Sequence, residues 1–280
     1  MHVGIVLFTP QIETLQKNLE ILSCSDNIEG IILVDNGSRN IEHIRELIKG
    51  NEKIYLIENN DNLGIATALN QMCRYALEVC NANWLLTLDD DSIVSNDLLT
   101  SYRIKSTENN PTTAIITCRI NDRNVGDMRS NNGTAIQEID YCITSGSLLN
   151  LALWSSLDGF DESMFIDGVD YDYCMRIVAA GYKIIRLNTV SLSHQVGNGK
   201  RVRLFGHNLI VLNHSENRLY YIARNYSYIG IKHHKKIKWY GNVLKRIYLV
   251  LMYETDKRVK LKSMISGIRD ARKGIMGKRQ

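Results

Sequence analysis

The sequence predicts an α/β protein with a mostly parallel central sheet that helices cover on both faces. In the first 120 residues, short apolar runs alternate with segments whose apolar residues recur at helical spacing. The apolar runs are continuous rather than interrupted by polar residues, which is typical of strands that are buried on both faces. Strands that alternate with helices in this way are joined by crossovers into a parallel sheet.

The elements of the first half follow from these two patterns. Each predicted strand is a run of apolar and β-branched residues, and each predicted helix repeats apolar side chains every three or four positions, as Leu15, Leu19 and Leu22 do. Ser95 is placed to cap the last of these helices. The strands are predicted at 3–8, 30–34, 53–57, 84–88 and 113–120, and the helices at 12–22, 66–80 and 96–104.

The second half is less regular. Residues 195–208 are rich in glycine and in basic residues, which predicts a mobile loop, and Ser215 can cap a helix that follows. Before that loop we expect a strand and a small-residue turn at 134–150, an acidic loop and a helix at 159–181, and a strand at 183–194. The chain is expected to divide into a main domain, 1–226, and a basic helical extension, 227–280.

Composition and charge narrow the possible settings. The longest apolar run, Ile247–Tyr253, is far shorter than the ~20 residues that span a bilayer. The six cysteines form no C-x-x-C pair, which favours reduced thiols in the cytoplasm. Residues 231–280 contain 15 Lys and Arg but 3 Asp and Glu, against 34 and 30 in the whole chain. An acidic body thus carries a basic tail, which favours an anionic membrane, nucleic acid or an acidic partner.

Polar side chains follow three of the predicted strands at the point where each strand ends. Thr9 and Pro10 follow the first strand, Asp35–Ser38 the second, and Asp89–Ser92 the fourth. In open parallel sheets, ligands bind outside the carboxyl ends of the strands. We therefore expect the three clusters to line one cleft.

Asp89 and Asp91 are the outer residues of a D-x-D triplet whose middle residue is Asp90. Two carboxylates at a strand end can hold Mg²⁺ or Mn²⁺ through oxygen ligands and leave positions open for substrate phosphates. A bound cation would also offset the repulsion among the three carboxylates. The alternative is an exposed acidic turn that caps the next helix, and the triplet alone favours neither.

Asp35 and the segment 62–70 suggest contacts with a nucleotide. A carboxylate at the tip of a strand can accept a hydrogen bond from a pyrimidine imide N–H or a ribose hydroxyl. Asn62 and Gly64 lie at a predicted helix start, whose backbone N–H groups can approach a nucleotide or phosphate. An ordinary Asp-Asn-Gly turn and an ordinary helix cap are the alternatives.

A second acidic cluster precedes the helix that ends at residue 181. Asp170 and Asp172 would point in different directions on a helix, and a carboxylate here can act as the general base for an acceptor hydroxyl. Favourable interaction of acids with a helix start explains Asp172 well and Asp167 less well. His194 ends a predicted strand, where it could complete a metal site or contact a diphosphate, or be an ordinary histidine.

Together these residues resemble inverting glycosyltransferases of family 2, which have the GT-A fold, and in particular bacterial rhamnosyltransferases of O-antigen and capsule assembly. The motifs stand in the family's order over roughly residues 3–226. They are VDNGS, NLGIATALN, LLTLDDDS, TSGSLL, GFDESMFIDGVDYDYCMRI, SLSH and NRLYYIARN, the last with no assigned role. The resemblance implies a Rossmann-like GT-A sheet, with a nucleotide-binding half at 1–120 and an acceptor half at 121–226.

The resemblance also implies roles for single residues. Asp170 matches the base position of an acidic motif usually written Glu-Asp, but Val169 stands at its first position, which leaves Asp167 as a rival. The nucleotide sugar would be bound by Thr9, Pro10, Asp35, Asn62, Gly64, Asp89 and Asp90, the metal by Asp91 and His194, and the acceptor by Ser145, Gly146 and Asp167.

The implied activity is metal-dependent transfer of a sugar from a nucleotide diphosphate to a glycan hydroxyl, with inversion. Rhamnose from dTDP-rhamnose is the expected donor, and UDP-linked hexoses are the alternative. The acceptor would be a glycan, such as one linked to polyprenyl diphosphate. An apolar stripe at 239–251 in the basic tail could lie on an anionic membrane, at the inner face of the bacterial cell membrane. Packing of this helix on the body, or in a homodimer, is the alternative.

Two other functions are compatible with parts of the sequence. A nucleotidyltransferase acting on sugar phosphates also holds metal on paired aspartates, but usually has a glycine-rich basic loop near the first strand. The segment LFTPQIETL has no such loop. A nucleic-acid-binding protein could use the basic tail, but the carboxylates of the predicted cleft would repel phosphate unless a metal were bound.

Overall fold

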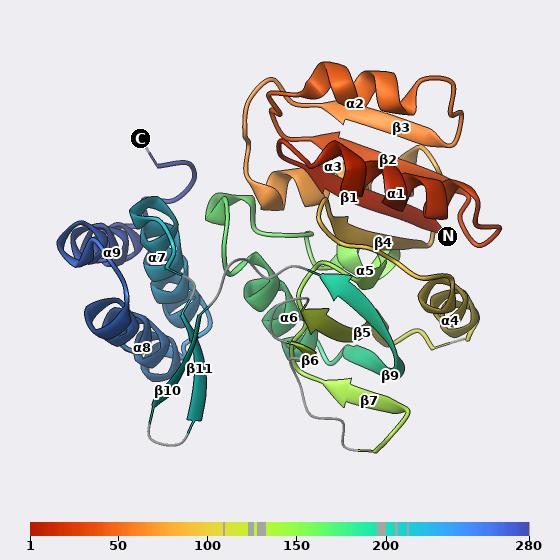
Figure 1. The fold of residues 1–280 in the computed structure, drawn as a ribbon. Coiled ribbons are helices and arrows are strands. Elements are labelled where there is room, and N and C mark those ends of the chain that lie inside the picture. The colour runs from red at the N-terminus through yellow and green to blue at the C-terminus, as the bar shows by residue number, and fades with distance from the viewer. Residues whose placement is uncertain are drawn as a thin grey trace.

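In the computed structural model, a central sheet is covered by helices, and three further helices form a bundle at the C-terminal end of the chain (Figure 1). The structure describes residues 1–279 except 109, 123–125, 128–132, 195–199, 205–206 and 212. At 122, 126–127, 194, 200–204 and 207–210 it describes the backbone alone.

Eight strands lie side by side in the central sheet, and the first four in spatial order are parallel. These are β3 (Ile54–Glu58), β2 (Gly30–Asp35), β1 (His2–Leu7) and β4 (Trp84–Asp89). The order continues with β8 (Ser147–Asn150), β5 (Thr113–Asp122), β9 (Lys183–His194) and β7 (Ile136–Ile139), and β6 (Gly126–Asp127) pairs with β5 outside this order. β5 and β9 are parallel, whereas β8 and β7 run antiparallel to their neighbours. The predicted mostly parallel α/β fold is confirmed.

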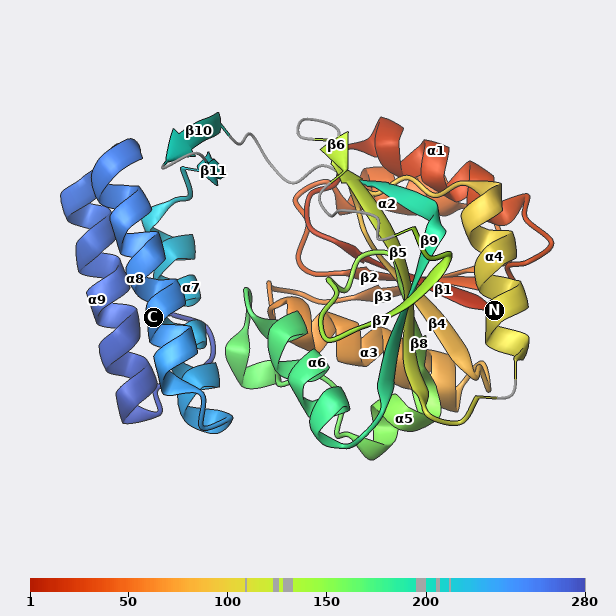
Figure 2. The same ribbon diagram turned by 90° about the horizontal axis from the view of Figure 1, so that it is seen from below.

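Helices cover both faces of the sheet (Figure 2). Residues of α1 (Ile12–Ser23), α2 (Ile41–Ile48) and α4 (Asn96–Thr107) pack on one face, and residues of α3 (Ile65–Glu78), α5 (Leu151–Ser156) and α6 (Val169–Ala179) pack on the other. A 3₁₀ turn, Glu162–Met164, precedes α6. Each face of the sheet therefore has its own hydrophobic core. Within β2, Ile31 and Leu33 pack in the core beneath α1, α2 and α4, and Ile32 and Val34 pack in the core beneath α3, α5 and α6. Two cores explain why the strands are apolar without a break.

Three parts of the chain differ from the sequence prediction. The short helix α2 follows β2, where no helix was expected. Residues 147–150 form the strand β8, although a small-residue turn was predicted there. β8 has only four residues, so its character comes from pairing with β4 and β5 rather than from its own pattern. β10 (Lys200–Leu204) and β11 (His207–Val211) form an antiparallel pair that begins within the predicted mobile loop and ends just after it; residues 195–199 and 205–206 of that loop lie outside the described chain.

The C-terminal bundle consists of α7 (Glu216–Lys232), α8 (Lys236–Tyr253) and α9 (Lys257–Lys273). Ser215 caps α7 as predicted, because its hydroxyl oxygen accepts the Arg218 N–H. The bundle has its own small hydrophobic core. The buried Trp239 of α8 also packs in the core beneath α3, α5 and α6. The predicted division of the chain at 226/227 falls within α7. No helix in the described part of the chain combines the length and the hydrophobicity needed to cross a membrane.

Candidate active site

The carboxyl ends of β2, β1 and β4 lie next to one another, as the parallel topology requires. In the register of the sheet, Leu7 at the end of β1 is opposite Asp35, and Val6 is opposite Asp89. β1 therefore separates the two aspartates by the width of one strand. The second and the third polar cluster flank the first across this narrow span, so one ligand can contact all of them.

Hydrogen bonds join the loops that follow these strands. Thr9, whose φ is +55°, donates its backbone N–H to Ser38 Oγ at 2.7 Å. The preceding Phe8 donates its N–H to Asp90 Oδ2 at 3.2 Å, and Pro10 is buried beside them. Asp90, the middle residue of the triplet, thus holds the first loop in place.

The Asp35 carboxylate is buried, and the turn that follows it satisfies one of its two oxygens. Oδ2 accepts the backbone N–H groups of Gly37 and Ser38, each at 3.1 Å. Gly37 has φ +85°, and a Cβ there would lie 2.9 Å from the Asp61 carbonyl carbon, so the turn requires glycine. Among the described residues, buried Oδ1 has no hydrogen-bond partner. This oxygen is therefore suited to accept a hydrogen bond from a ligand N–H or hydroxyl.

Asn62 and Gly64 lie where the start of α3 contacts the loop that precedes α6. Asn62 Oδ1 accepts the Gly64 N–H at 2.9 Å, and the Ile65 N–H at the start of α3 donates to the Phe165 carbonyl at 2.7 Å. A Cβ on Gly64 would lie 2.6 Å from that carbonyl oxygen. The first N–H of α3 thus serves this contact within the chain, and a role of Asn62 or Gly64 in nucleotide binding stays a prediction.

Ser145 and Gly146 support the carboxylate turn from inside the sheet. The buried Ser145 hydroxyl oxygen accepts the Asp89 N–H at 3.0 Å and lies 2.7 Å from the Ser92 hydroxyl. The Gly146 carbonyl accepts the hydroxyl of the buried Tyr102 at 2.5 Å. These contacts fix Asp89 at the end of β4, and contact of either residue with an acceptor stays a prediction.

The end of β9 lies beside the same turn. The Ile93 N–H donates to the Ser193 carbonyl at 3.0 Å, so the backbone of His194 is close to the carboxylate triplet. The side chain of His194 lies outside the described residues. Its part in metal binding therefore stays a prediction.

Asp89 and Asp91 are oxygen donors that suit Mg²⁺ or Mn²⁺. Both side chains line a cavity of about 630 Å³. Within the described residues, no group of three or more His, Cys, Asp and Glu side chains is arranged to hold a metal ion. Mg²⁺ is commonly bound by one or two carboxylates together with substrate phosphates and water. The two aspartates therefore fit a cation that a bound diphosphate would complete.

Both acidic clusters face one cleft. A cavity of about 630 Å³ is lined by the carboxylate triplet and by Asp167 and Asp170, and a neighbouring cavity of about 420 Å³ shares Asp89, Tyr141 and Asp170 with it. These volumes are typical of sites for small ligands. Residues of α7 and α8, in the C-terminal bundle, form the opposite wall of the larger cavity.

Asp170 is a partly buried carboxylate held by a neutral donor. The Tyr141 hydroxyl donates to Oδ2 at 2.7 Å, and the Tyr171 N–H donates to Oδ1 at 2.9 Å. Burial raises the pKa of Asp170 to about 6, although the Tyr141 hydrogen bond acts in the opposite direction. Asp170 is thus ionised at neutral pH and is more basic than an ordinary aspartate, as a general base requires.

Asp167 is held by a cation. Arg218 Nη2 lies 3.2 Å from Asp167 Oδ1, and burial raises the pKa of Asp167 while Arg218 opposes the rise. The backbone here is unusual, because Phe165, Asp167 and Gly168 have φ of +63°, +64° and +85°. For residues other than glycine this conformation costs about 1–3 kcal/mol each, so the surrounding structure must hold the loop.

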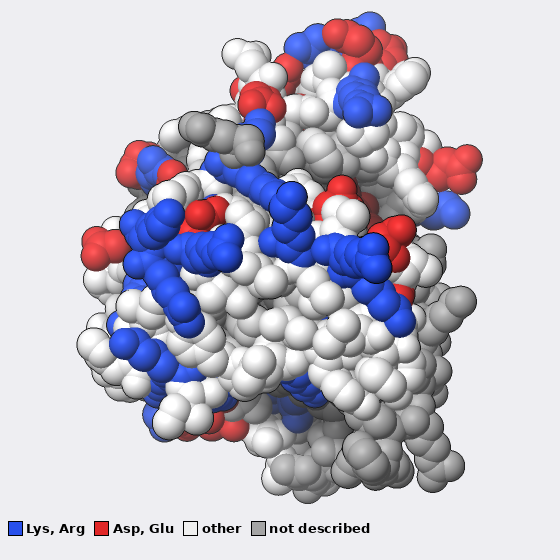
Figure 3. Space-filling view, turned by 90° about the vertical axis from the view of Figure 1, so that its left-hand side faces the viewer, with Lys and Arg blue, Asp and Glu red and all other residues white. Residues whose placement is uncertain are grey.

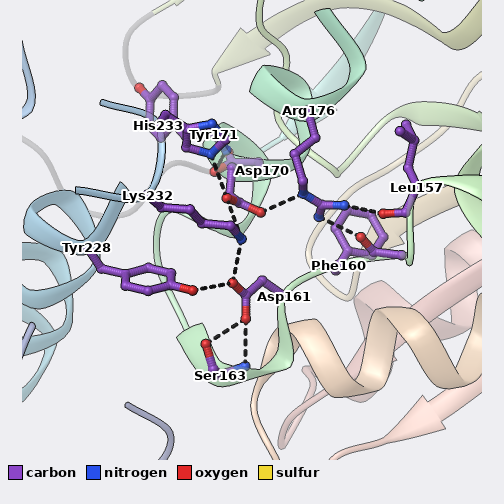
Figure 4. Close-up of polar contacts among 12 residues, drawn as sticks. Leu157, Phe160, Asp161, Ser163, Asp170, Tyr171, Arg176, Tyr228, Lys232 and His233 are labelled. Atoms are coloured by element: carbon purple, nitrogen blue, oxygen red, sulfur yellow. Dashed lines mark hydrogen bonds and ion pairs between the residues drawn. The ribbon is translucent and has the colours of Figure 1, made fainter. Parts of the chain in front are cut away.

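Asp172 has a structural role. Its buried carboxylate is contacted by Arg176 Nε at 2.9 Å, Lys232 Nζ at 2.9 Å and His233 Nε2 at 2.8 Å. Lys232 also contacts Asp161 at 2.7 Å, so it lies between two carboxylates and joins the end of α7 to α6 and to the loop before it (Figure 4). The interpretation of Asp172 as an acid that stabilises its helix fits this ion-pair network better than a role in the cleft.

The motif NRLYYIARN anchors the loop that carries Asp167. The amide nitrogen of Asn225, which is fully buried, lies 2.8, 2.7 and 2.7 Å from the carbonyl oxygens of Met164, Ile166 and Asp167. The buried Arg224 donates to the Met164 carbonyl at 2.9 Å and stays in place through Asn225 Oδ1, also at 2.9 Å. The side chains of α7 thus fix the loop in its strained conformation.

Two contributors to the cleft were missed by the sequence analysis. Tyr141 lies within a stretch of strand-like pattern, and only the folded sheet brings its hydroxyl to Asp170. Arg246 was assigned to the basic tail as one of many cations, whereas in the fold it lines the cleft. The sequence carries no local signal for either role, because both depend on packing between distant segments.

Comparison with known proteins agrees with this fold and identifies a family. Residues 12–157, more than half of the 280 residues, match the family model described as Glycosyl transferase family 2. The chain is similar to the dTDP-rhamnosyl transferase RfbF of Shigella flexneri, with 25% identity over 294 residues that cover 99% of this chain and 97% of that protein.

Two solved structures are similar in fold. One is TarS of S. aureus, with a TM-score of 0.65 and 13% identity over 96% of this chain and 80% of that chain. The other is the mannosyltransferase PcManGT of Pyrobaculum calidifontis, in complex with GDP-Man and Mn²⁺, with a TM-score of 0.60 and 16% identity over 97% of this chain and 74% of that chain. With its GT-A fold, the chain belongs to glycosyl transferase family 2.

Proposed function

We propose that the protein transfers a sugar from a nucleotide diphosphate to a hydroxyl of a glycan acceptor, with inversion at the anomeric carbon. The observation that carries this proposal is the arrangement of two carboxylate clusters around one cleft, in a chain of a glycosyltransferase family. One cluster lies at the end of β4, and the other lies at the start of α6. They suit the two ends of a single displacement reaction.

Asp170 accepts the proton of the acceptor hydroxyl in this proposal. The acceptor oxygen then forms a bond to the anomeric carbon on the face opposite the diphosphate. The bond from that carbon to the phosphate oxygen breaks, and its electron pair leaves with the nucleoside diphosphate. A single displacement inverts the carbon and forms no covalent enzyme intermediate. The Tyr141 hydroxyl orients the Asp170 carboxylate for this step.

The other cluster receives the donor. Asp35 Oδ1 is suited to the base or the ribose, together with Thr9 and Pro10 on the adjoining loop. Mg²⁺ or Mn²⁺ held by Asp91, with His194 as a further ligand, would neutralise charge on the diphosphate leaving group. The Mn²⁺ and GDP-Man of the similar mannosyltransferase structure support this assignment.

dTDP-rhamnose is the proposed donor, because the similar RfbF protein is a dTDP-rhamnosyl transferase. A thermal-shift series with dTDP, UDP and GDP, each with and without Mn²⁺, tests the nucleotide. A ligand at 100 times its Kd stabilises the native state by about 2.7 kcal/mol. If dTDP-rhamnose is the donor, dTDP with Mn²⁺ binds most tightly and should raise the melting temperature most. Stabilisation by UDP alone would point to a UDP-linked hexose, and no response to any nucleotide would contradict the proposal.

The same assay tests the metal ligand. Asp91→Asn should lose the Mn²⁺-dependent part of the nucleotide shift, because an amide oxygen binds the cation more weakly than a carboxylate. Asp97→Asn is the control, since it removes a carboxylate from an exposed position of the next helix, outside the cavity lining. Retention of the full Mn²⁺ response in Asp91→Asn would show that the metal is bound elsewhere.

The acceptor is proposed to be linked to a lipid such as polyprenyl diphosphate, and the chain to contact an anionic membrane from the cytoplasmic side. The predicted stripe on α8 proves to have two faces: Trp239 and Val243 are buried, whereas Leu244, Tyr248 and Leu251 are exposed. Lys and Arg side chains gather around the C-terminal helices on this side of the molecule (Figure 3). Exposed apolar residues flanked by cations suit an anionic lipid surface.

A further inference from the structure

One wall of the cleft is basic, in contrast to the carboxylate triplet at the end of β4. Arg218 near the start of α7, Arg246 in the middle of α8 and His214 just before α7 all line the cavity that also contains Asp89 and Asp170. These three residues come from the C-terminal part of the chain, outside the segment that matches the family model. The proposed mechanism does not use them.

Arg246 is a largely buried cation whose two nearby carboxylates, Asp167 and Glu254, are each paired more closely with another cation. Its side chain is 15% exposed, and Glu254 Oε1 lies 4.0 Å from Nη1. Glu254 is itself paired with Lys260, whose Nζ lies 2.9 Å from Oε2. Among the described residues, Arg246 makes no hydrogen bond. A guanidinium has five N–H donors, and leaving them without acceptors in a buried setting is costly.

The surroundings of His214 show that this wall is electropositive. Burial, together with the nearby Arg218, Arg246 and Lys260, lowers the pKa of His214 to about 3. The ring is therefore neutral at physiological pH, where it offers one N–H donor. Positive potential and N–H donors on one cavity wall favour an anionic ligand with several oxygen acceptors.

We propose that Arg246, with Arg218 and His214, forms a binding subsite for a phosphate-type anion of the substrate. This proposal rests on the proposed function, which supplies two possible sources of such an anion. One is the diphosphate of the donor, and the other is a phosphate or diphosphate on the acceptor. Arg218 also contacts Asp167, beside the proposed base, so the subsite adjoins the place where the acceptor hydroxyl reacts. An anion bound there would fix how far the reacting sugar extends into the cleft.

Inorganic pyrophosphate is the probe for this subsite, and its binding is measured by calorimetry with EDTA present, so that no cation assists binding at the carboxylate triplet. Arg246→Gln should weaken binding at least about tenfold, the usual effect of losing a charge-assisted hydrogen bond. Lys245→Gln, which removes the same charge from the exposed neighbouring position, should bind as the wild type does. Arg246→Lys keeps the charge and should fall between the two.

Unchanged pyrophosphate binding in Arg246→Gln, or an equal loss in Lys245→Gln, would overturn the proposal. Thermal unfolding of each variant shows whether it is folded. A second arm measures nucleoside diphosphate binding with Mn²⁺: equal binding by wild type and Arg246→Gln assigns the subsite to the acceptor, and a parallel loss assigns it to the donor diphosphate. Pyrophosphate binding needs no sugar transfer, whereas absence of nucleotide binding by the wild type would contradict the proposed function instead.

Discussion

Two aspartates three positions apart differ in the groups that hold them. Asp167 faces the permanent charge of Arg218, whereas Asp170 faces the neutral hydroxyl of Tyr141. Burial raises the pKa of both carboxyl groups, but the Arg218 guanidinium opposes the rise at Asp167, whereas the pKa of Asp170 reaches about 6. The sequence left open which of the two residues is the base. The neutral partner of Asp170 favours Asp170 over Asp167 for this role.

The pH dependence of transfer follows from the ionisation of Asp170. Its pKa is raised to about 6, so the base is protonated below that pH and kcat/KM should fall about tenfold per unit there. Tyr141→Phe removes a hydrogen bond that stabilises the ionised form, so this limb should move upward by about one unit. The measurement is kcat/KM from about pH 4 to about pH 9 for both proteins, which covers about two units on the outer side of each expected limb. A limb that stays in place in Tyr141→Phe would remove Asp170 from the proton transfer.

At the scale of elements, the middle of α7 holds the loop before α6. Arg224 and Asn225 are both buried and both contact the Met164 carbonyl, although they lie about sixty positions away in sequence. A helix of the C-terminal bundle thus supports the loop that carries part of the proposed site. This gives the NRLYYIARN motif, which had no assigned role, a physical one.

Asn225→Ala should lower the free energy of unfolding by about 3 kcal/mol, because several buried carbonyl oxygens lose their donor. It should also lower kcat, since the loop that places Asp170 is no longer held, while nucleotide binding at the far wall changes little. Urea unfolding and steady-state kinetics check both effects. Asn217→Ala, at an exposed position of the same helix, is the control and should match the wild type. Wild-type kcat in Asn225→Ala would contradict this positioning role.

The elements with strong patterns of their own could be predicted from the sequence. The strands β1, β2 and β4 and the helices α1 and α3 were expected close to their observed bounds, because each has a long apolar run or a clear helical period. β8 could not be predicted, since its four residues become a strand only between β4 and β5. The same reason applies to the site: Asp35 and Asp89 follow strands, but Tyr141 and Arg246 reach the cleft only through tertiary packing.

At the scale of the whole molecule, the C-terminal bundle has two surfaces of different character. One surface carries Arg218 and Arg246 to the cleft, and the other exposes apolar residues and cations to the surroundings. The alternatives posed by the sequence, a helix packed on the body or a helix on a membrane, are therefore compatible. α8 packs on the body through Trp239 and still offers an exposed apolar face.

Membrane contact is tested by Leu244→Glu combined with Leu251→Glu. Each leucine contributes about 1.5–3 kcal/mol when fully buried, so the double variant should bind anionic liposomes at least about tenfold more weakly in a sedimentation assay. Ile104→Glu changes an exposed apolar residue of α4, far from the bundle, and serves as the control. Equal partitioning of the double variant and the wild type would rule out this surface.

The central claim is that a nucleotide sugar and an acceptor react in the cleft with Asp170 as the base. Its most direct test is the transfer rate of Asp170→Asn beside that of Asp167→Asn, with donor binding measured for both. We predict that Asp170→Asn lowers kcat about 10²–10⁴-fold and leaves donor binding intact, whereas Asp167→Asn retains most of the activity. Full transfer by Asp170→Asn together with its loss in Asp167→Asn would contradict the account and make Asp167 the base.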